Sequence, residues 1–416
     1  MSEMIQIRQE QESFVLVAAA LEEEQAAWDS LEELQELAET SGAAVVGQVL
    51  QNRSAFDPAT YVGSGKIEEI HSLLLQTGAT GILCDDELSP AQIANLNDLL
   101  HTKVIDRTLV ILDIFARRAS SAEGKAQVEL AQQRYNLTHL AGLGRSLSRL
   151  GGGIGTRGPG EKKLEMDRRR IRSRISQLKR EIREIQQHRQ VTRENRQRSS
   201  IRQAAVVGYT NAGKSTLLNC LTGAGVLEED RLFATLDPTT RLLQLEGGQE
   251  ILLTDTVGFI SKLPHHLIEA FRSTLEEAKY ADYIIHVVDA SSPQMEEHIR
   301  VVYETLEQLG IGRHRIITLL NKMDLVEGPL YYRDPHAVKT IRTSLRKGEG
   351  TELVKQALTE LLLEESVYLE HCFPYASAGS IQLIRKYGNL LAEEYTPEGI
   401  RVRAYVPREI YRKVKP

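Results

Sequence analysis

The sequence predicts an α/β protein built from four parts. Short apolar runs rich in β-branched residues alternate with helical patterns before residue 110 and again after residue 200, which indicates parallel sheets. Between them, a glycine-rich stretch precedes a long heptad pattern, which is typical of a helical hairpin. We expect an N-terminal parallel α/β domain (1–124), a long basic helical hairpin with a Gly-rich tip (125–200), a P-loop domain with a mostly parallel sheet (201–365) and a small C-terminal α+β domain (366–416).

Composition is that of a globular protein. Of 416 residues, 41% are hydrophobic and 26% are charged, which are ordinary values for a domain-forming chain. Cys84, Cys220 and Cys372 lie far apart without metal-ligand spacing, so we expect a reducing compartment. No apolar run approaches the roughly 18 residues that span a bilayer, and the acidic N-terminus lacks the apolar segment of a signal peptide. We expect a cytoplasmic protein.

The first domain alternates strands with helices. Strands are predicted at 14–20, 44–50, 81–85 and 103–106, and helices at about 31–41, after the glycine loop 61–66 and after the cap Ser89-Pro90. The glycine loop lacks the G-K-[ST] ending of a phosphate-binding loop. We interpret it as a structural turn and leave open whether this domain binds ATP.

The second domain has an apolar seam. A helix over 125–140 and a long helix after residue 161 flank a stretch with six glycines and one proline in residues 150–161. The apolar residues of the long helix, spaced by 7, 4, 3, 4 and 3, are Leu164, Ile171, Ile175, Leu178, Ile182 and Ile185. This seam could close on the other helix of the hairpin or on a second chain; we expect a monomer.

The same domain carries a concentrated positive charge. From Arg145 to Arg202 there are 18 Lys/Arg and 6 Asp/Glu, a balance of +12, so the remainder of this −6 chain carries −18. A solvated coiled-coil surface usually mixes both signs, whereas the arginines between 168 and 174 have few acids nearby. Because no aromatic residues are interleaved, the pattern favours salt-sensitive contact with an RNA backbone over base reading. The tip, Gly151–Gly160, is expected to enter a crevice of that partner.

The third domain begins with a phosphate-binding loop. A β-branched run ends at Gly208, and Gly213-Lys214-Ser215 follows at the spacing G-x-x-x-x-G-K-[ST]. Glycines let backbone N–H groups approach a polyphosphate at the positive end of the following helix. Lys214 would neutralise the β/γ oxygens and the Ser215 hydroxyl would ligate Mg²⁺. The residues predicted to cradle the phosphates are Gly208, Tyr209, Thr210, Asn211, Ala212, Gly213, Lys214, Ser215 and Thr216.

Two further motifs complete a nucleotide site. Asp255-Thr256-Val257-Gly258 follows a predicted strand, so that Asp255 could hold Mg²⁺ through water and the Gly258 N–H could bond the γ-phosphate. A switch threonine is expected among Thr235, Thr239 and Thr240, which this reasoning does not separate.

Asn321-Lys322-Met323-Asp324 follows the predicted strand 316–320. The Asp324 carboxylate can accept from guanine N1–H and the 2-amino group, which adenine cannot supply, so the predicted nucleotide is GTP. Ser344, Leu345 and Arg346 occupy the place of a loop that backs the base in GTPases.

Two residues shape the expected chemistry. Phe259 stands where many GTPases carry a glutamine that positions water, and a phenyl ring cannot do this, so hydrolysis should be slow until a partner binds. Asn211 lies inside the P-loop, as in some GTPases that recruit K⁺ beside the phosphates. We therefore hypothesise stimulation by potassium.

These motifs together resemble the HflX family of translational GTPases over essentially the whole chain. In the first two domains the resemblance rests on residues 63–66, 85–90, 104–115, 123–130 and, most specifically, 148–161. In the third it rests on residues 208–215, 233–237, 255–260 and 321–324.

The resemblance implies a cytoplasmic GTPase that binds the large ribosomal subunit and splits stalled or idle ribosomes under stress. It implies that the switch threonine is Thr235, which makes Lys214, Thr235 and Gly258 the expected catalytic residues and Ser215, Thr235 and Asp255 the expected metal site. The nucleotide-contacting switch residues that it implies are Phe233, Ala234, Thr235, Leu236 and Asp237.

Two other function classes stay open at this point. One is a GTP-timed RNA-remodelling factor, which would need a catalytic cluster outside the third domain. The other is a regulatory binding protein that acts on membrane or protease partners. GTP-dependent co-sedimentation with large ribosomal subunits would separate these readings.

Overall fold

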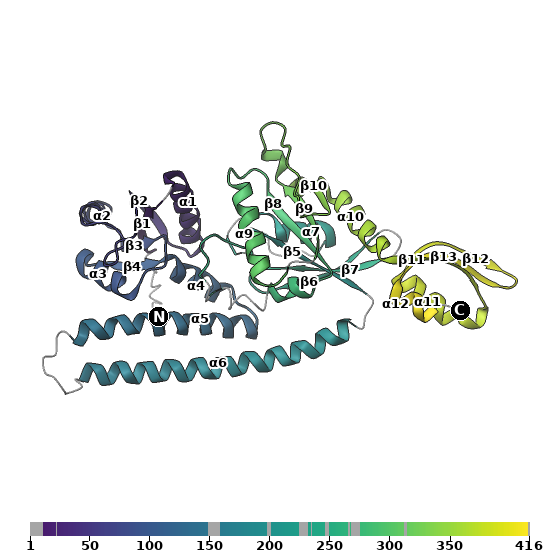
Figure 1. Ribbon diagram of the computed structural model, residues 1–416, viewed down its shortest axis with the longest axis horizontal. Helices are drawn as coiled ribbons and strands as arrows, with labels where there is room; N and C mark the ends of the chain where they lie inside the picture. The colour runs from purple at the N-terminus through teal and green to yellow at the C-terminus, as the bar shows by residue number, and fades with distance from the viewer. Residues whose placement is uncertain are drawn as a thin grey trace, which may run out of the picture. The chain divides into compact units, whose positions relative to one another are not determined.

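The computed structural model describes residues 11–21, 23–148, 159–197, 201–223, 232–233, 235–245, 249–264, 267, 275–311 and 314–414. The chain divides into two compact units. The first consists of Met1–Glu184 with Ser261–Ala270, and the second of Ile185–Ile260 with Phe271–Pro416. The predicted α/β class is confirmed in its parts: a parallel N-terminal sheet, a helical pair, a mostly parallel central sheet and a small C-terminal sheet (Figure 1).

The first unit contains a four-stranded parallel sheet in the order β2-β1-β3-β4. Its strands are β1 (Ser13–Ala20), β2 (Ala44–Asn52), β3 (Gly81–Cys84) and β4 (Lys103–Asp106). The central strands β1 and β3 are apolar and almost wholly buried, as expected for strands covered on both faces.

Four helices cover this sheet (Figure 1). They are α1 (Glu24–Thr40), α2 (Ser64–Thr77), α3 (Pro90–Leu100) and α4 (Arg107–Arg118). The α3 helix starts where Ser89-Pro90 predicts, because the Ser89 side chain accepts from the Gln92 N–H and completes a capping box. Apolar residues of α2 and α3 pack on one face of the sheet around Val15, Val17 and Ile82.

A long helical pair follows α4. The helices are α5 (Ala122–Ser148) and α6 (Pro159–Gln197), and α5 extends beyond the predicted 125–140. Leu178 and Ile182 of the predicted seam are buried against Ala126 and Leu130 of α5. The seam therefore closes on the helix that precedes it in the same chain. The predicted glycine tip lies outside the described residues, apart from the backbone of residues 159–160 at the start of α6.

The second unit is organised by a six-stranded sheet in the order β10-β9-β8-β5-β7-β6. Its strands are β5 (Arg202–Gly208), β6 (Thr239–Gln244), β7 (Glu250–Asp255), β8 (Tyr283–Asp289), β9 (Arg315–Asn321) and β10 (Lys339–Arg342). All neighbours are parallel except β6 and β7. The carboxyl ends of β5, β7 and β9 therefore meet at one edge, which is where the predicted motifs begin.

Helices and short turns pack around this sheet. They are α7 (Lys214–Thr222), α9 (Met295–Gln308), α10 (Thr351–Glu364) and the 3₁₀ turns η2 (Met323–Leu325) and η3 (Leu345–Lys347). The core joins Leu217 and Leu218 of α7 to Leu358 and Leu361 of α10. Burial of this apolar set fixes the helices that carry the site.

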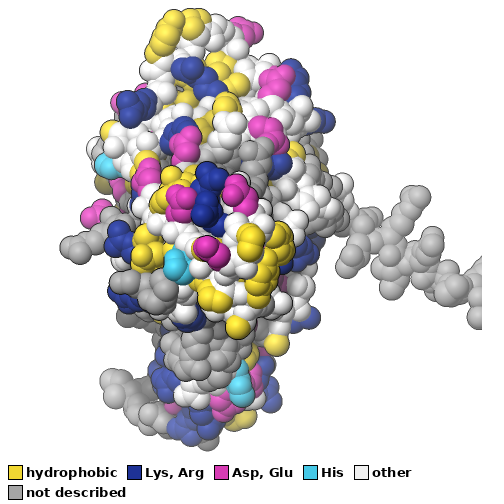
Figure 2. Space-filling model, turned by 90° about the vertical axis from the view of Figure 1, so that its right-hand side faces the viewer, with side chains coloured by type: hydrophobic (Ala, Val, Ile, Leu, Met, Phe, Trp, Pro, Cys, Tyr) yellow, Lys and Arg dark blue, Asp and Glu magenta, His cyan; other side chains and the backbone are white. Residues whose placement is uncertain are grey.

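The C-terminal region forms an antiparallel sheet in the order β11-β13-β12. Its elements are β11 (Ser366–Phe373), η4 (Tyr375–Ser377), α11 (Ala378–Tyr387), β12 (Asn389–Thr396), β13 (Gly399–Pro407) and α12 (Arg408–Val414). Charges of both signs lie side by side on the face drawn in Figure 2, and the pairs Arg385–Glu393 and Arg403–Glu394 belong to this region. Such a mixed surface contrasts with the single sign that dominates the sequence of α6.

Candidate nucleotide site

The predicted P-loop connects β5 to α7. Gly213 has a φ of 102°, and an added Cβ would lie 2.3 Å from Asn321 Nδ2. Gly208 is equally constrained, because an added Cβ would lie 2.2 Å from the Val287 carbonyl oxygen. Only glycine fits these two close approaches. The loop is therefore shaped by contacts with β8 and β9 as well as by its own sequence.

Lys214 lies buried at the start of α7. Its Nζ donates to the Tyr209 carbonyl oxygen at 2.7 Å, and an added Cβ on Gly258 would lie 2.9 Å from that Nζ. Burial lowers the pKa of Lys214 to about 8, against an opposing effect of Asp255. The ammonium is thus held beside the two motifs that are predicted to meet the γ-phosphate.

Three oxygen-bearing side chains meet beside Lys214. Ser215 Oγ lies 3.0 Å from Thr235 Oγ1 and donates to Asp255 Oδ2 at 2.9 Å. Asp255 is fully buried, and its other oxygen, Oδ1, has no hydrogen-bond donor within the described part of the chain. Burial raises the pKa of Asp255, partly offset by Lys214 and the Ser215 hydroxyl. The structure therefore brings together the three predicted metal ligands.

The geometry distinguishes the candidate switch threonines. Thr240 Oγ1 lies 2.9 Å from Thr254 Oγ1, where β6 pairs with β7. Thr239 also lies in β6, opposite Asp255 in the backbone register. The Thr235 hydroxyl, by contrast, lies within hydrogen-bonding distance of Ser215 Oγ, at 3.0 Å. This arrangement supports Thr235 as the switch residue.

Residues 255–259 are attached to the P-loop by their backbone. The Phe259 N–H donates to the Gly208 carbonyl oxygen at 3.1 Å, and the Thr210 N–H donates to the Phe259 carbonyl oxygen at 2.8 Å. The Thr256 hydroxyl donates to Val206 of β5 at 2.8 Å. The Thr256 side chain therefore binds the backbone of β5, and its predicted contact with the nucleotide stays a prediction. Phe259 is 2% exposed. A phenyl ring has no hydrogen-bonding group that could orient water.

Asn321 connects the P-loop to the predicted base-contacting loop. Its Nδ2 donates to the Ala212 carbonyl oxygen at 2.9 Å, and its Oδ1 accepts from the Leu345 N–H at 3.0 Å. The Thr343 hydroxyl is within 3.4 Å of the same oxygen. Asn321 is thus a brace between two loops. Thr343 was not predicted, because no motif marks it in the sequence.

The Asp324 carboxylate is oriented by Ser344. The Ser344 hydroxyl donates to Asp324 Oδ1 at 2.7 Å, and Lys347 Nζ lies 3.6 Å from Oδ2. The hydrogen bond from Ser344 is the main cause that lowers the pKa of Asp324. Lys322 has a φ of 61° and pairs with Asp289 at 2.7 Å. These contacts leave Asp324 an ionised acceptor, as recognition of guanine requires.

The other predicted contact residues lie around this site in different settings. Phe233, Leu236 and Val257 are buried, whereas Asn211, Thr216, Asp237 and Met323 are half-buried and Arg346 is exposed. Ala234 lies outside the described residues. Sequence reasoning did not find the stacking of the Tyr209 ring on His298 of α9, with ring centroids 3.8 Å apart, because the two residues are far apart in the chain.

Family models match the chain in consecutive segments. Residues 28–116 match a model described as GTP-binding GTPase N-terminal, residues 118–196 a GTP-binding GTPase middle region, and residues 203–322 a 50S ribosome-binding GTPase. GTPase HflX of Lacrimispora saccharolytica is 58% identical over 411 residues, covering 99% of this chain and 97% of that protein. The chain belongs to the HflX family of GTPases.

Other HflX proteins support the same conclusion. That of Caldanaerobacter subterraneus subsp. tengcongensis is 46% identical and covers 99% of this chain and 95% of its own. That of Escherichia coli K12 is 44% identical and covers 81% of this chain and 80% of its own. The predicted family and GTP-hydrolysing activity are therefore confirmed. None of the helices in the described part of the chain has the length and apolar character needed to cross a membrane.

Proposed function

We propose that this HflX-family GTPase binds the large ribosomal subunit in its GTP state and promotes the splitting and recycling of stalled or idle ribosomes under stress. The observation that carries this proposal is the match of residues 203–322 to a family described as 50S ribosome-binding GTPases. The proposed site of action is the cytoplasm, where ribosomes are found.

The exposed face of α6 supplies a surface for ribosomal RNA. Arg174 pairs with Glu129 of α5 at 2.6 Å, and Arg169 pairs with Glu165 at 3.2 Å. Arg168, Arg170 and Arg172 have no ion pair within the described residues. Unpaired guanidinium groups on a rigid helix can each contact a phosphate. The tip 151–160 is proposed to enter a crevice of the subunit.

The residues at the nucleotide site fit a Mg²⁺ ion. Ser215, Thr235 and Asp255 offer hydroxyl and carboxylate oxygens, which Mg²⁺ prefers, and the unsatisfied Asp255 Oδ1 requires a partner. When bound, the ion would neutralise charge on the β- and γ-phosphates. Lys214 would add a positive charge there, the Gly258 N–H would sense the γ-phosphate, and Asp324 would select guanine.

The proposed cycle follows from these roles. GTP orders residues 225–242 and 255–264, which enables ribosome binding, and hydrolysis reverses that order. Because Phe259 is buried and apolar, hydrolysis by the isolated protein should be slow. A group supplied or oriented by the ribosome would accelerate it.

Co-sedimentation with purified large subunits tests the proposal. The protein loaded with a non-hydrolysable GTP analogue should pellet with the subunits, whereas the GDP-loaded protein should stay in the supernatant. Subunits should raise the hydrolysis rate, and intact ribosomes should separate in the presence of GTP. Equal pelleting in both nucleotide states, without a rise in hydrolysis, would refute the proposed function.

A further inference from the structure

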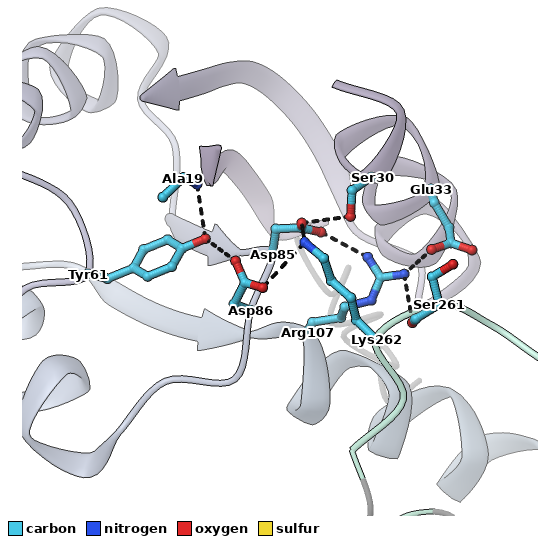
Figure 3. A network of polar contacts seen from close by, with 9 residues as sticks. All are labelled: Ala19, Ser30, Glu33, Tyr61, Asp85, Asp86, Arg107, Ser261 and Lys262. Carbon is cyan, nitrogen blue, oxygen red and sulfur yellow. Dashed lines mark hydrogen bonds and ion pairs between the residues drawn. The ribbon is translucent and has the colours of Figure 1, made fainter. Parts of the chain in front are cut away.

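Within the first unit, a buried network of charges receives residues that follow the γ-phosphate motif in sequence (Figure 3). Asp85, at the end of β3, and Arg107, at the start of α4, are 0% and 1% exposed. Arg107 Nη1 donates to Asp85 Oδ1 at 2.8 Å, and its Nη2 pairs with Glu33 of α1. Asp85 Oδ2 also accepts from the Ser30 hydroxyl at 2.7 Å.

Ser261 and Lys262 bind to this network. Lys262 Nζ pairs with Asp85 Oδ2 and lies 3.3 Å from Asp86 Oδ1. The Ser261 carbonyl oxygen accepts from Arg107 Nη2 at 3.3 Å. Burial alone would raise the pKa of Asp85, but the charges of Arg107 and Lys262 outweigh it and hold that pKa below its ordinary value. Asp85 and Asp86 thus bind the Lys262 ammonium directly, and Asp85 is linked to the Ser261 carbonyl oxygen through Arg107.

Asp86 is itself held in place for this contact. The Tyr61 hydroxyl donates to Asp86 Oδ2 at 2.5 Å and accepts from the Ala19 N–H of β1 at 3.1 Å. Tyr61 is 1% exposed and has a φ of 68°, an uncommon conformation for a non-glycine residue. The glycine loop 61–66, which lacks the G-K-[ST] ending, therefore places the Tyr61 hydroxyl against the Asp86 carboxylate.

Few residues separate this network from the nucleotide site. Phe259 is bonded to the P-loop backbone on both sides, and the chain passes from the second unit to the first between Ile260 and Ser261. Lys262 follows Gly258 by four residues, which span at most about 14 Å when extended. Lys262 also has a φ of 53°. Such a conformation persists only where surrounding contacts hold it.

We propose that Lys262 is a positioning residue for the GTPase reaction. Its ion pairs with Asp85 and Asp86 hold residues 258–261 in the arrangement that accepts the γ-phosphate, and so link the nucleotide state to the first unit. The proposal rests on the proposed role of Gly258. The observations that carry it are the bonds of Phe259 to the P-loop backbone and, three residues later, the ion pairs of Lys262.

The ion pairs of Lys262 should affect the affinity for GTP but not the affinity for GDP. If the segment is held before binding, less conformational freedom is lost when the γ-phosphate orders Gly258. GDP makes no contact there, so its affinity is independent of the anchor. Because the Lys262 side chain is 40% exposed, its removal leaves the buried Arg107–Asp85 pair in place. A general loss of folding is therefore not expected.

The test compares affinities in the full-length protein for GDP and for a non-hydrolysable GTP analogue. Lys262→Ala should weaken binding of the analogue by about 5- to 10-fold and leave GDP binding and the melting temperature unchanged. Lys262→Arg should restore the analogue's affinity. Lys103→Ala is the matched control, because Lys103 is also an ion-paired lysine of the first unit, bound to Glu12 at 2.7 Å and 48% exposed.

Asp86→Asn provides a second variant, since Asp86 is 19% exposed. It should reproduce part of the Lys262→Ala effect, because Asp85 still pairs with Lys262, and the double variant should be no worse than Lys262→Ala alone. Equal losses for GDP and the analogue, no loss, or additive effects would overturn the proposal. Gly258→Ala separates the two possible failures. If it too leaves the preference for the analogue intact, the proposed role of Gly258 is wrong; if it abolishes that preference while Lys262→Ala does not, only the anchor is wrong.

Discussion

At the scale of single residues, the contacts of Asp324 fit its proposed role of distinguishing guanine from adenine. Ser344 holds one oxygen at 2.7 Å and keeps the pKa of Asp324 low, so the group is an ionised acceptor at neutral pH. Specificity of this kind comes from a buried or oriented group that the wrong base leaves without a partner.

Replacing this carboxylate should change the base that is bound. Asp324→Asn is expected to weaken GTP binding by about 10²-fold, because one charged acceptor faces two donors of guanine. The asparagine N–H can donate to the 2-oxo group of xanthine, so XTP binding should improve. Titration with fluorescent GTP and XTP measures both changes. A variant that still binds GTP with wild-type affinity would contradict the role of Asp324.

Lys214 should make the nucleotide-free protein less stable. Because burial lowers its pKa from 10.5 to about 8, the unfolded chain binds more protons between these values, and stability should rise as the pH rises from about 8 to 10.5. Below pH 8 the full cost, about 3 kcal/mol at most, is present. Lys214→Met should therefore be more stable than wild type in urea unfolding at pH 7, with a smaller difference at pH 9.5.

The same substitution should abolish tight GTP binding, since a thioether cannot neutralise phosphate oxygens. A stability difference that stays constant between pH 7 and 9.5 would show that burial of the ammonium is not its cause.

Asn211 is half-buried in the P-loop with a φ of 59°. If it helps to hold K⁺ beside the phosphates, GTP hydrolysis should be faster in potassium than in sodium salts of equal ionic strength. Asn211→Ala should remove this difference. Equal wild-type rates in the two salts would dispose of the hypothesis.

At the scale of elements, α6 has one face that packs on α5 and another that is proposed to bind RNA. Leu178 and Ile182 pack against α5, and the Arg174–Glu129 pair reinforces that contact. Arg168, Arg170 and Arg172, which have no ion pair within the described part of the chain, are the arginines proposed to meet a polyanion. A helix with one apolar stripe presents the rest of its circumference to solvent or to a partner.

Neutralising the outer arginines should weaken ribosome binding and make it less sensitive to salt. The triple variant Arg168→Gln/Arg170→Gln/Arg172→Gln is expected to reduce the slope of log affinity against log salt by about 2 to 3, as expected for three lost phosphate contacts. GTP affinity should not change. Arg174→Gln is the matched control, because Glu129 already neutralises that arginine. A control that lowers the slope as much as the triple variant would argue against direct phosphate contacts.

At the scale of the whole molecule, the proposed function assigns GTP binding and the stimulation of hydrolysis by the ribosome to different parts of the chain. The predicted nucleotide-contacting residues belong to the second unit, whereas the tip 151–160 belongs to the first. Deleting residues 151–160 should leave GTP affinity intact and abolish stimulation of hydrolysis by large subunits. Nucleotide titration and a phosphate-release assay with and without subunits measure the two properties. Unchanged stimulation would contradict the proposed role of the tip.

The sequence by itself determined the fold class, the family and the order of the motifs. Periodicity of 2 or 3.6 and the glycines at 208 and 213 are local properties, so they can be read without coordinates. The Ser89-Pro90 cap and the seam of α6 are predicted correctly for the same reason. The sequence did not predict the antiparallel strand β6, the full length of α5 or the strand β12. Sheet edges and helix ends depend on partners that are distant in sequence.

Only the tertiary structure decided which side chains meet. It brought Thr235 to Ser215 and left Thr240 within the sheet, and it gave Thr256 and Asn321 bracing contacts that their motif positions do not reveal. It also joined Lys262 to Asp85, 177 residues apart in the chain. Such contacts arise because strands distant in sequence end at a common edge of a sheet. A charged or polar group that is buried there costs free energy unless it forms a hydrogen bond or an ion pair, and its partners come from segments that are distant in sequence.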